Sequence, residues 1–217
     1  MTTVELPDAA VFDWDGTIVD TMGMIYRANV VVLRRHGIEL TREWFRDQYT
    51  PDWRRAYAEL GVPEALWDAT ATHWTEEMGR NRPRALPWAR GGLRRLRRQG
   101  VRLGLVTAST RAVVEPNLVR LNLADMFETR WYADDVEQGK PHPEGLLRAL
   151  EDLGVSASRT VYVGDTPTDL QMAHAAGTGF AAVGATTAPA AFRTAGADRV
   201  WPGVGAWADH LLGCGPG

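Results

Sequence analysis

The chain has 217 residues, of which 45% are hydrophobic, enough to bury the core of one α/β domain that carries a smaller insert. Its formal net charge of -3 argues against nucleic acid or an anionic membrane surface as a partner. No stretch approaches the roughly 18 apolar residues of a membrane-spanning helix, and the first residues lack the basic and apolar regions of a signal peptide.

Short apolar runs alternate with amphipathic patterns along most of the chain, which is typical of a parallel sheet with crossover helices. The predicted strands cover residues 9–15, 101–109, 130–135, 159–165, 179–185 and 198–201. The predicted helices cover residues 90–100, 112–123, 143–154 and 169–177, each with a glycine or asparagine near its C-terminal end. We therefore expect an α/β fold built on a parallel sheet.

Residues 20–83 interrupt this alternation, because only helical patterns occur between the first two strands. Thr50 is expected to cap one helix, with Pro51 in its first turn, and Gly61 to end it. Two further patterns, over residues 22–37 and 66–78, indicate additional helices. We expect an all-helical insert at 20–83 and a sheet domain formed by 1–19 and 84–217, with crossings at 16–20 and 81–87.

Polar side chains stand at or shortly after the ends of the predicted strands. They are Asp13, Asp15, Thr107, Lys140, Asp165 and Asp169. Because the carboxyl ends of parallel strands meet at one edge of the sheet, these side chains should converge on one pocket. So many carboxylates cannot all ionise together without a counter-charge, and Mg²⁺ with oxygen ligands is the cation that suits them best.

In order along the chain, the motifs are D-x-D-G-T at residues 13–17, a strand ending in Thr107, Lys-Pro at 140–141 and G-D-x-x-x-D at 164–169. This set resembles the haloacid dehalogenase-like superfamily of aspartate-nucleophile phosphotransferases, which share a Rossmann-like core. The helical insert lies where the C1-capped subgroup, which includes phosphoglycolate phosphatases and β-phosphoglucomutases, carries a small cap domain. The resemblance thus implies a Rossmann-like catalytic core with a helical cap.

The resemblance implies that Asp13 attacks phosphorus and forms an aspartyl-phosphate. Asp15 then protonates the leaving alkoxide and later takes a proton from the hydrolytic water. Mg²⁺ is expected to be held by Asp13, the carbonyl oxygen of Asp15 and Asp165. The paired acids of the first motif are therefore interpreted as a nucleophile and its proton shuttle.

The remaining motif residues are implied to surround the phosphate. The Thr107 hydroxyl and the Ala108 backbone N–H, expected at a helix start, would bind phosphate oxygens. Lys140 would offset the charge of the transferring group, and Asp169 would orient that lysine or act through a water molecule. Lys140 is the only lysine among the 24 lysine and arginine residues, which favours a role that an arginine cannot fill.

Each motif also has a simpler interpretation. The sequence D-W-D-G-T fits an ordinary Asp-Gly turn after a strand, and Lys140 could be a leftover loop lysine. The last motif fits a helix start capped by Asp165 or Thr166, without any metal. The joint occurrence of the motifs in one chain favours the chemical interpretation.

We expect a Mg²⁺-dependent phosphoric monoester hydrolase that acts on a small phosphorylated metabolite. The alternatives are a β-phosphoglucomutase-like phosphomutase and a catalytically silent binding protein of the same fold. Gly164 stands where the mutase pattern usually has an acid, and Thr17 also suits a phosphatase. Asp15 argues against a dehalogenase, because that reaction needs no second acid. Ala108 replaces a frequent polar residue, which leaves assignment to phosphoglycolate phosphatase open.

The cap is expected to select the substrate, because every motif residue lies outside it. Its tryptophans are expected to form mostly its own core, with one or two facing the cleft; these are Trp44, Trp53, Trp67 and Trp74. Four arginines could grip a second anionic group or simply face solvent; these are Arg42, Arg46, Arg54 and Arg55. The lone cysteine, Cys214, excludes a disulfide framework, and we expect a cytoplasmic protein, monomeric or weakly dimeric.

Overall fold

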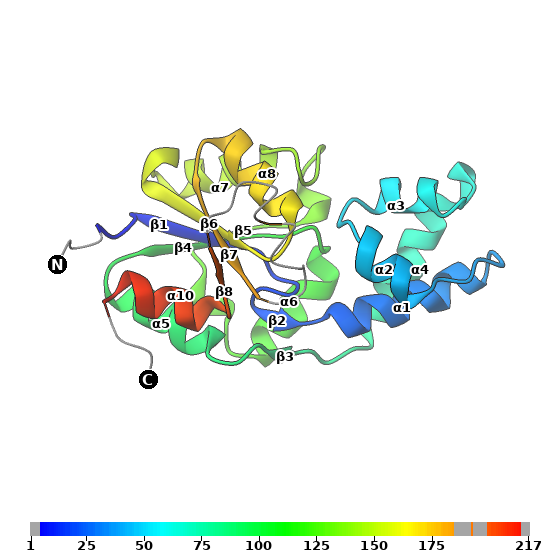
Figure 1. Ribbon diagram of the computed structural model, residues 1–217, viewed down its shortest axis with the longest axis horizontal. Helices are drawn as coiled ribbons and strands as arrows, with labels where there is room; N and C mark the ends of the chain where they lie inside the picture. The colour runs from blue at the N-terminus through cyan, green and yellow to red at the C-terminus, as the bar shows by residue number, and fades with distance from the viewer. Residues whose placement is uncertain (1–4, 185–191, 193–198, 214–217) are drawn as a thin grey trace.

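The computed structural model describes residues 5–184, 192 and 199–213. Its centre is a six-stranded sheet, in which every neighbouring pair is parallel and the strand order is β5-β4-β1-β6-β7-β8 (Figure 1). The strands are β1 (Ala9–Phe12), β4 (Arg102–Val106), β5 (Thr129–Trp131), β6 (Thr160–Gly164), β7 (Gly179–Val183) and β8 (Val200–Trp201). The predicted α/β class with a parallel sheet is confirmed.

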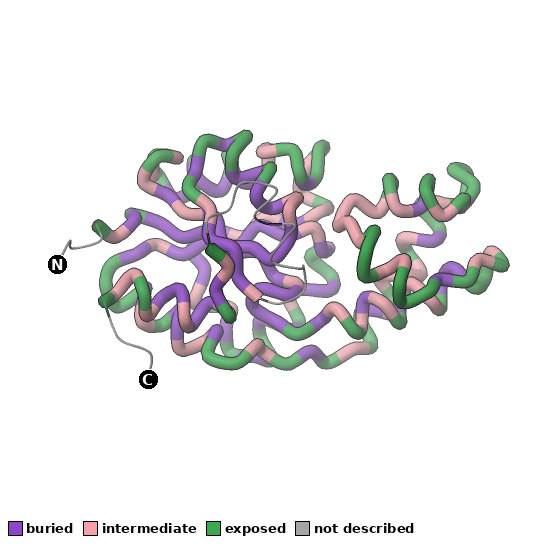
Figure 2. Tube along the Cα trace, in the orientation of Figure 1, coloured by how far each residue is buried: buried purple, intermediate pink, exposed green. Residues whose placement is uncertain are grey.

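Helices cover both faces of this sheet, which is why the central strands are almost continuously apolar. Helices α5 (Ala89–Arg98), α6 (Arg111–Arg120) and α10 (Val204–Leu211) pack on one face. Helices α7 (Glu144–Leu153) and α8 (Pro167–Ala176) pack on the other. Figure 2 shows the buried strands between helices whose outer surfaces are exposed. In the arginine-rich α5, Leu93 and Leu96 are fully buried and the arginines lie around them, as the sequence predicts.

Four α-helices lie between β1 and β4 along the chain and project to one side of the sheet (Figure 1). They are α1 (Met22–Arg34), α2 (Arg42–Gln48), α3 (Trp53–Glu59) and α4 (Trp67–Gly79). The chain enters and leaves this region through β2 (Val19–Asp20) and β3 (Arg84–Ala85), which pair antiparallel. At the base, Ile25, Ala28 and Met78 pack with Val113 of α6, so the helical region rests on the sheet domain through an apolar contact.

Several local expectations were wrong. No helix was expected at the positions of α2 and α10. Helix α3 is capped by Asp52 and not by Thr50. The Asp52 side chain accepts a hydrogen bond from the Arg55 N–H, while the Thr50 hydroxyl accepts one from the Asp52 N–H. Helix α6 has Thr110 as its N-cap, so Ala108 belongs to the preceding loop and not to a helix start.

Three expectations fall partly or wholly outside the described residues, namely those for Cys214, for the start of the predicted strand 198–201 and for the last residue of the predicted strand 179–185. Within the described ranges, no helix combines the length and the apolar character needed to cross a bilayer.

Candidate active site

The end of β1 delivers Asp13 to the edge of the sheet. Its backbone N–H donates to the Val163 carbonyl (2.9 Å), which holds the residue beside the end of β6. Trp14, between the two acids, is fully buried in the apolar core. The chain then turns at Gly16, whose φ of 73° lies in the left-handed region, and the Gly16 N–H donates to the Val19 carbonyl (2.9 Å). This tight turn keeps Asp15 at the same edge as Asp13.

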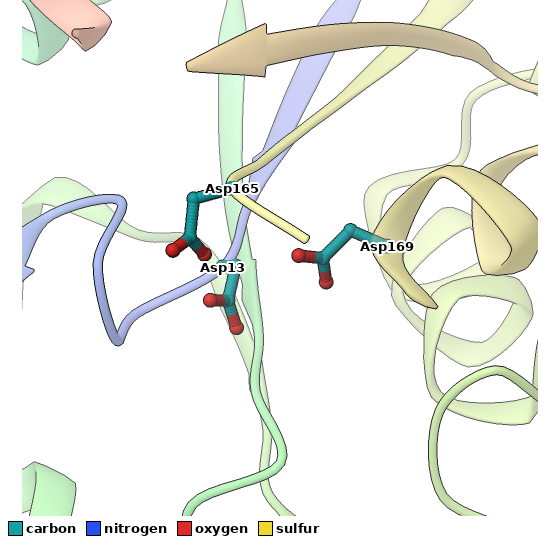
Figure 3. A group of neighbouring side chains, drawn as sticks. All are labelled: Asp13, Asp165 and Asp169. Carbon is teal, nitrogen blue, oxygen red and sulfur yellow. The ribbon is translucent and has the colours of Figure 1, made fainter. Parts of the chain in front are cut away.

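Three carboxylates converge at this edge from different elements. One oxygen from each of Asp13, Asp165 and Asp169 lies within 4.8 Å of the others, and all three residues are buried. Figure 3 shows these side chains directed toward one another, from the ends of β1 and β6 and from the start of α8. The strand ends thus bring together Asp13 and Asp165, which lie about 150 positions apart in the sequence. This is the arrangement expected for a parallel sheet.

Lys140 enters this acidic group and is itself buried. Its Nζ donates to an oxygen of Asp13 (2.5 Å) and to an oxygen of Asp169 (2.8 Å), and its side chain is only 4% exposed. Burial lowers the pKa of the Lys140 ammonium, but the two carboxylates outweigh that effect and raise it, so the group stays charged at neutral pH. Burial also raises the pKa of Asp13 to about 7, which Lys140 partly offsets.

Asp169 both orders the helix and positions the lysine. One carboxylate oxygen accepts hydrogen bonds from the Thr166 N–H (3.0 Å) and hydroxyl (2.7 Å), completing a capping box at the start of α8. The other oxygen accepts from Lys140. The N-cap of α8 is therefore Thr166 and not Asp165. The last motif thus forms a capped helix start, as its simpler interpretation expects, and also contributes two acids to the cluster.

Ser109 was not among the predicted site residues. Its hydroxyl donates to one oxygen of Asp15 (2.6 Å). Burial raises the pKa of Asp15, and the Ser109 hydrogen bond opposes that rise. The only signal in the sequence was a Ser-Thr pair after the strand, which also suits a helix entry, so the role of Ser109 could not be separated from capping.

Thr107 and Ala108 lie in the loop between β4 and α6 and line a cleft that also reaches Lys140. The Thr107 hydroxyl oxygen accepts a hydrogen bond from the Ser109 N–H (3.0 Å), which leaves its hydrogen available to an incoming oxygen. Both residues line a cleft of about 540 Å³, and Ala108 also lines the cavity that contains the acids. The hydrogen-bond donors at this position are therefore loop groups and not the N-terminus of a helix.

The donor set at this edge fits a hard divalent cation. Three buried carboxylates face one lysine, so the group carries excess negative charge when all are ionised. Carboxylate oxygens are the ligands that Mg²⁺ prefers, and no sulfur or imidazole ligand occurs in this group. The Asp15 side chain is not part of this group of three carboxylates, and one of its oxygens accepts the Ser109 hydrogen bond.

The helical region forms one wall of the cavity above the acids. The cavity of about 120 Å³ above the acids is lined on that side by Trp44, Trp53 and Trp74, whereas Trp67 packs in the interior of the helical region. Two of the four arginines considered above form exposed ion pairs with neighbours on their own helices, Arg46 with Asp47 and Arg55 with Glu59. These pairs favour the solvent-facing interpretation.

Comparison with known proteins is consistent across sequence and structure. The model of the haloacid dehalogenase-like hydrolases matches residues 10–183. The plasmid phosphoglycolate phosphatase of Cupriavidus necator is 35% identical over 188 residues, covering 82% of this chain and 81% of that one.

Two solved structures extend the comparison to the fold. A HAD family hydrolase from Deinococcus radiodurans with bound phosphate and sodium is 26% identical, with a TM-score of 0.72 over 96% of this chain and 97% of that one. CbbY from Rhodobacter sphaeroides in complex with phosphate is 24% identical, with a TM-score of 0.79 over 92% of this chain and 96% of that one. At this level of identity the similarity shows the fold alone.

Proposed function

The chain belongs to the haloacid dehalogenase-like hydrolases and is a phosphatase, and from that premise we propose that it hydrolyses a small-molecule phosphomonoester with Mg²⁺ through an aspartyl-phosphate on Asp13. The observation that carries the proposal is the buried contact of one lysine with two acids, Asp13 and Asp169. A buried ion group of this kind gives weak or no stabilisation, so its placement in a cavity supports a chemical role.

In the first step, a carboxylate oxygen of Asp13 attacks phosphorus, and the bond from phosphorus to the leaving oxygen breaks. Asp15 gives its proton to that oxygen, which leaves as an alcohol. Water then attacks the phosphorus of the aspartyl-phosphate and gives a proton to Asp15. Inorganic phosphate leaves, and Asp13 is regenerated. The raised pKa of Asp15 supports this role, because it favours the protonated form that the first step requires.

The other side chains of the site support the same reaction. Asp13, the Asp15 carbonyl oxygen and Asp165 are the proposed ligands of Mg²⁺, which supplies positive charge to the phosphoryl oxygens when bound. Lys140 offsets charge on the transferring group, and Asp169 holds that ammonium in place.

The phosphomutase alternative is disfavoured at Gly164. A Cβ atom at this position would lie 2.6 Å from both Cβ and Cγ of Asp169, so an acidic side chain has no room there while Asp169 holds Lys140. The expected mutase acid is thus absent, and the surroundings of Gly164 exclude it sterically. This supports transfer of the phosphoryl group to water and not to a second substrate hydroxyl.

The direct test is hydrolysis of 4-nitrophenyl phosphate with MgCl₂ or with EDTA. We expect Mg²⁺-dependent turnover, at least about a thousandfold loss in Asp13→Asn, and no change in Asp68→Asn, an exposed acid of α4. Circular dichroism checks that each variant folds, and calorimetric titration with MgCl₂ measures metal binding without activity. Full hydrolysis by Asp13→Asn would refute the nucleophile.

We also propose a cytoplasmic location and a monomeric or weakly dimeric state. The single cysteine of the sequence is compatible with a reducing compartment. Light scattering after size-exclusion chromatography tests the assembly, and a molar mass above that of a dimer would refute it.

A further inference from the structure

The cavity above the acids, here called the cap chamber, has an unusual lining for a site that binds a charged metabolite. Its volume is about 120 Å³, and its floor is formed by the acids and Lys140. Six aromatic side chains of the helical region contribute to its walls and roof; these are Trp44, Phe45, Tyr49, Trp53, Tyr57 and Trp74. Rings at this density favour an apolar or aromatic guest.

We propose that the substrate's leaving group is uncharged and largely apolar, about the size of one ring, and that it occupies the cap chamber. This inference rests on the proposed phosphatase function and specifies its substrate class. It predicts that the chain discriminates against small phosphomonoesters that carry a carboxylate, in contrast to the substrate named for its phosphoglycolate phosphatase relatives.

The distribution of charge in the chamber carries this inference. Among the described residues, the helical region contributes no charged side chain to the lining. Its side chains with polar groups are all neutral, and apart from the tryptophans they are Asn29, Tyr49, Thr50, Tyr57 and Thr75. The one cation on the floor, Lys140, is already bonded to two carboxylates. A carboxylate on the leaving group would be desolvated here with no cation of its own, beside several acids.

Tyr49 of the helical region gives the chamber a neutral hydroxyl donor. Tyr49 packs against Phe45, with ring centroids 5.0 Å apart, and lines the chamber together with the acids. Burial raises the pKa of Tyr49 well above its ordinary value, and the negative field of Asp15 raises it further. The phenol thus remains protonated and can donate to a neutral oxygen of a leaving group.

The arginines of the helical region lie outside the chamber. The Arg42 guanidinium lies over the Tyr26 ring (4.9 Å to the centroid), and the Arg54 guanidinium over the Trp53 ring (4.2 Å). Arg54 lines the separate cleft of about 540 Å³, which also reaches Lys140. That outer cleft is the competing location for a leaving group, and it would suit an anionic one.

The size of the chamber limits the guest. An engineered apolar cavity of about 150 Å³ binds benzene, so a chamber of about 120 Å³, whose floor also borders the phosphoryl site, limits the leaving group to at most a single small ring or a short branched chain. Its proximity to Asp13 and Asp15 places such a group directly beside the phosphoryl site.

The test compares phosphomonoesters that share a primary CH₂–O–phosphate bond and differ only in the attached group. Benzyl phosphate carries a neutral ring, 2-hydroxyethyl phosphate a small neutral group and 2-phosphoglycolate a carboxylate. We expect kcat/KM for benzyl phosphate to exceed that for phosphoglycolate by about 100-fold, with hydroxyethyl phosphate between them. Equal or better hydrolysis of phosphoglycolate would overturn the inference but leave the proposed function intact. If none of the three esters is hydrolysed, and 4-nitrophenyl phosphate is not hydrolysed either, both the inference and the proposed function are overturned.

Matched variants locate the leaving group. Trp44→Ala should lower the ratio of benzyl phosphate to phosphoglycolate kcat/KM by about tenfold, mainly through KM, because one aromatic wall is lost. Trp67→Ala removes a tryptophan of the same helical region outside the chamber, so any loss there should affect both substrates alike. Arg54→Ala should leave the ratio unchanged. A selective loss of phosphoglycolate turnover in that variant would place the leaving group in the outer cleft and overturn the inference.

Discussion

Replacing Lys140 by arginine tests whether the site needs a compact ammonium or only a positive charge. The Nζ atom contacts an oxygen of Asp13 at 2.5 Å and one of Asp169 at 2.8 Å, in a side chain that is 4% exposed. A guanidinium is planar and larger, and its donors diverge in one plane. We therefore expect Lys140→Arg to lose one of the two contacts and to strain the surrounding packing.

The size of the effect follows from these contacts. One charge-assisted hydrogen bond contributes about 1.5–3 kcal/mol, and each 1.4 kcal/mol lost from the transition state is about a tenfold change in rate. The expected loss in kcat/KM is thus roughly 10- to 100-fold. Overpacking costs about 1–3 kcal/mol of unfolding free energy, so Tm should fall by roughly 2 to 12 °C.

The assay measures kcat/KM with 4-nitrophenyl phosphate and Tm by differential scanning calorimetry. Lys140→Met keeps length but removes charge and leaves Asp13 and Asp169 without this partner, so we expect a larger loss of activity. Arg148→Lys makes the reverse exchange at an exposed ion pair and should change neither quantity. Activity of Lys140→Arg within threefold of the original enzyme would refute the geometric reasoning and favour a loop lysine without a special role.

Four further outcomes are expected. Ser109→Ala removes the 2.6 Å hydrogen bond that lowers the pKa of Asp15, so this pKa should rise further. The alkaline limb of the pH profile of kcat/KM should therefore move to higher pH, and a limb that does not move contradicts this. Because burial raises the pKa of Asp13 to about 7, calorimetric Mg²⁺ affinity should fall about tenfold per pH unit below 7. Without metal, the same shift should make the unfolding free energy fall as pH rises from about 4 to about 7, since the folded state binds more protons; a flat dependence in urea titrations contradicts it. Gly164→Ala should reduce activity and Tm, because its Cβ has no room, whereas Gly79→Ala, with open space around it, should not.

The sheet and the acids of the site were predictable because their signals are local. Because each central strand is buried on both faces, it appears in the sequence as a short apolar run. The polar residue that follows the run marks the end of the strand. Asp13 and Asp165 follow β1 and β6 directly, and these strands are neighbours in the sheet. A motif at the end of each strand was therefore sufficient to predict that the two side chains meet.

Helix starts and contacts between loops were less predictable, because several residues compete for the same local role. Thr50 and Asp52 can both cap a helix; Asp52 does so, while Thr50 accepts a hydrogen bond from the Asp52 N–H. The seven-residue helix α2 is too short for a clear periodic pattern. The contact of Ser109 with Asp15 spans 94 positions and depends on the turn after β1, which no pattern near Ser109 reports.

Reaction and substrate choice depend on signals of different physical kinds. The reaction needs charged groups at strand ends. Such groups stand out after apolar runs in the sequence, and they come together because the strands of the sheet are parallel. A chamber wall needs apolar rings, and these occupy the same kind of helical position as the interior of a small domain. Trp44 lines the chamber, whereas the indole N–H of Trp67 donates to the Val62 carbonyl inside the helical region. In the sequence, both tryptophans are apolar residues of short predominantly helical segments, and nothing nearby distinguishes them. Similarity to a relative can therefore carry over the phosphatase chemistry, whereas the identity of the leaving group depends on which rings the packing of four short helices turns toward Asp13.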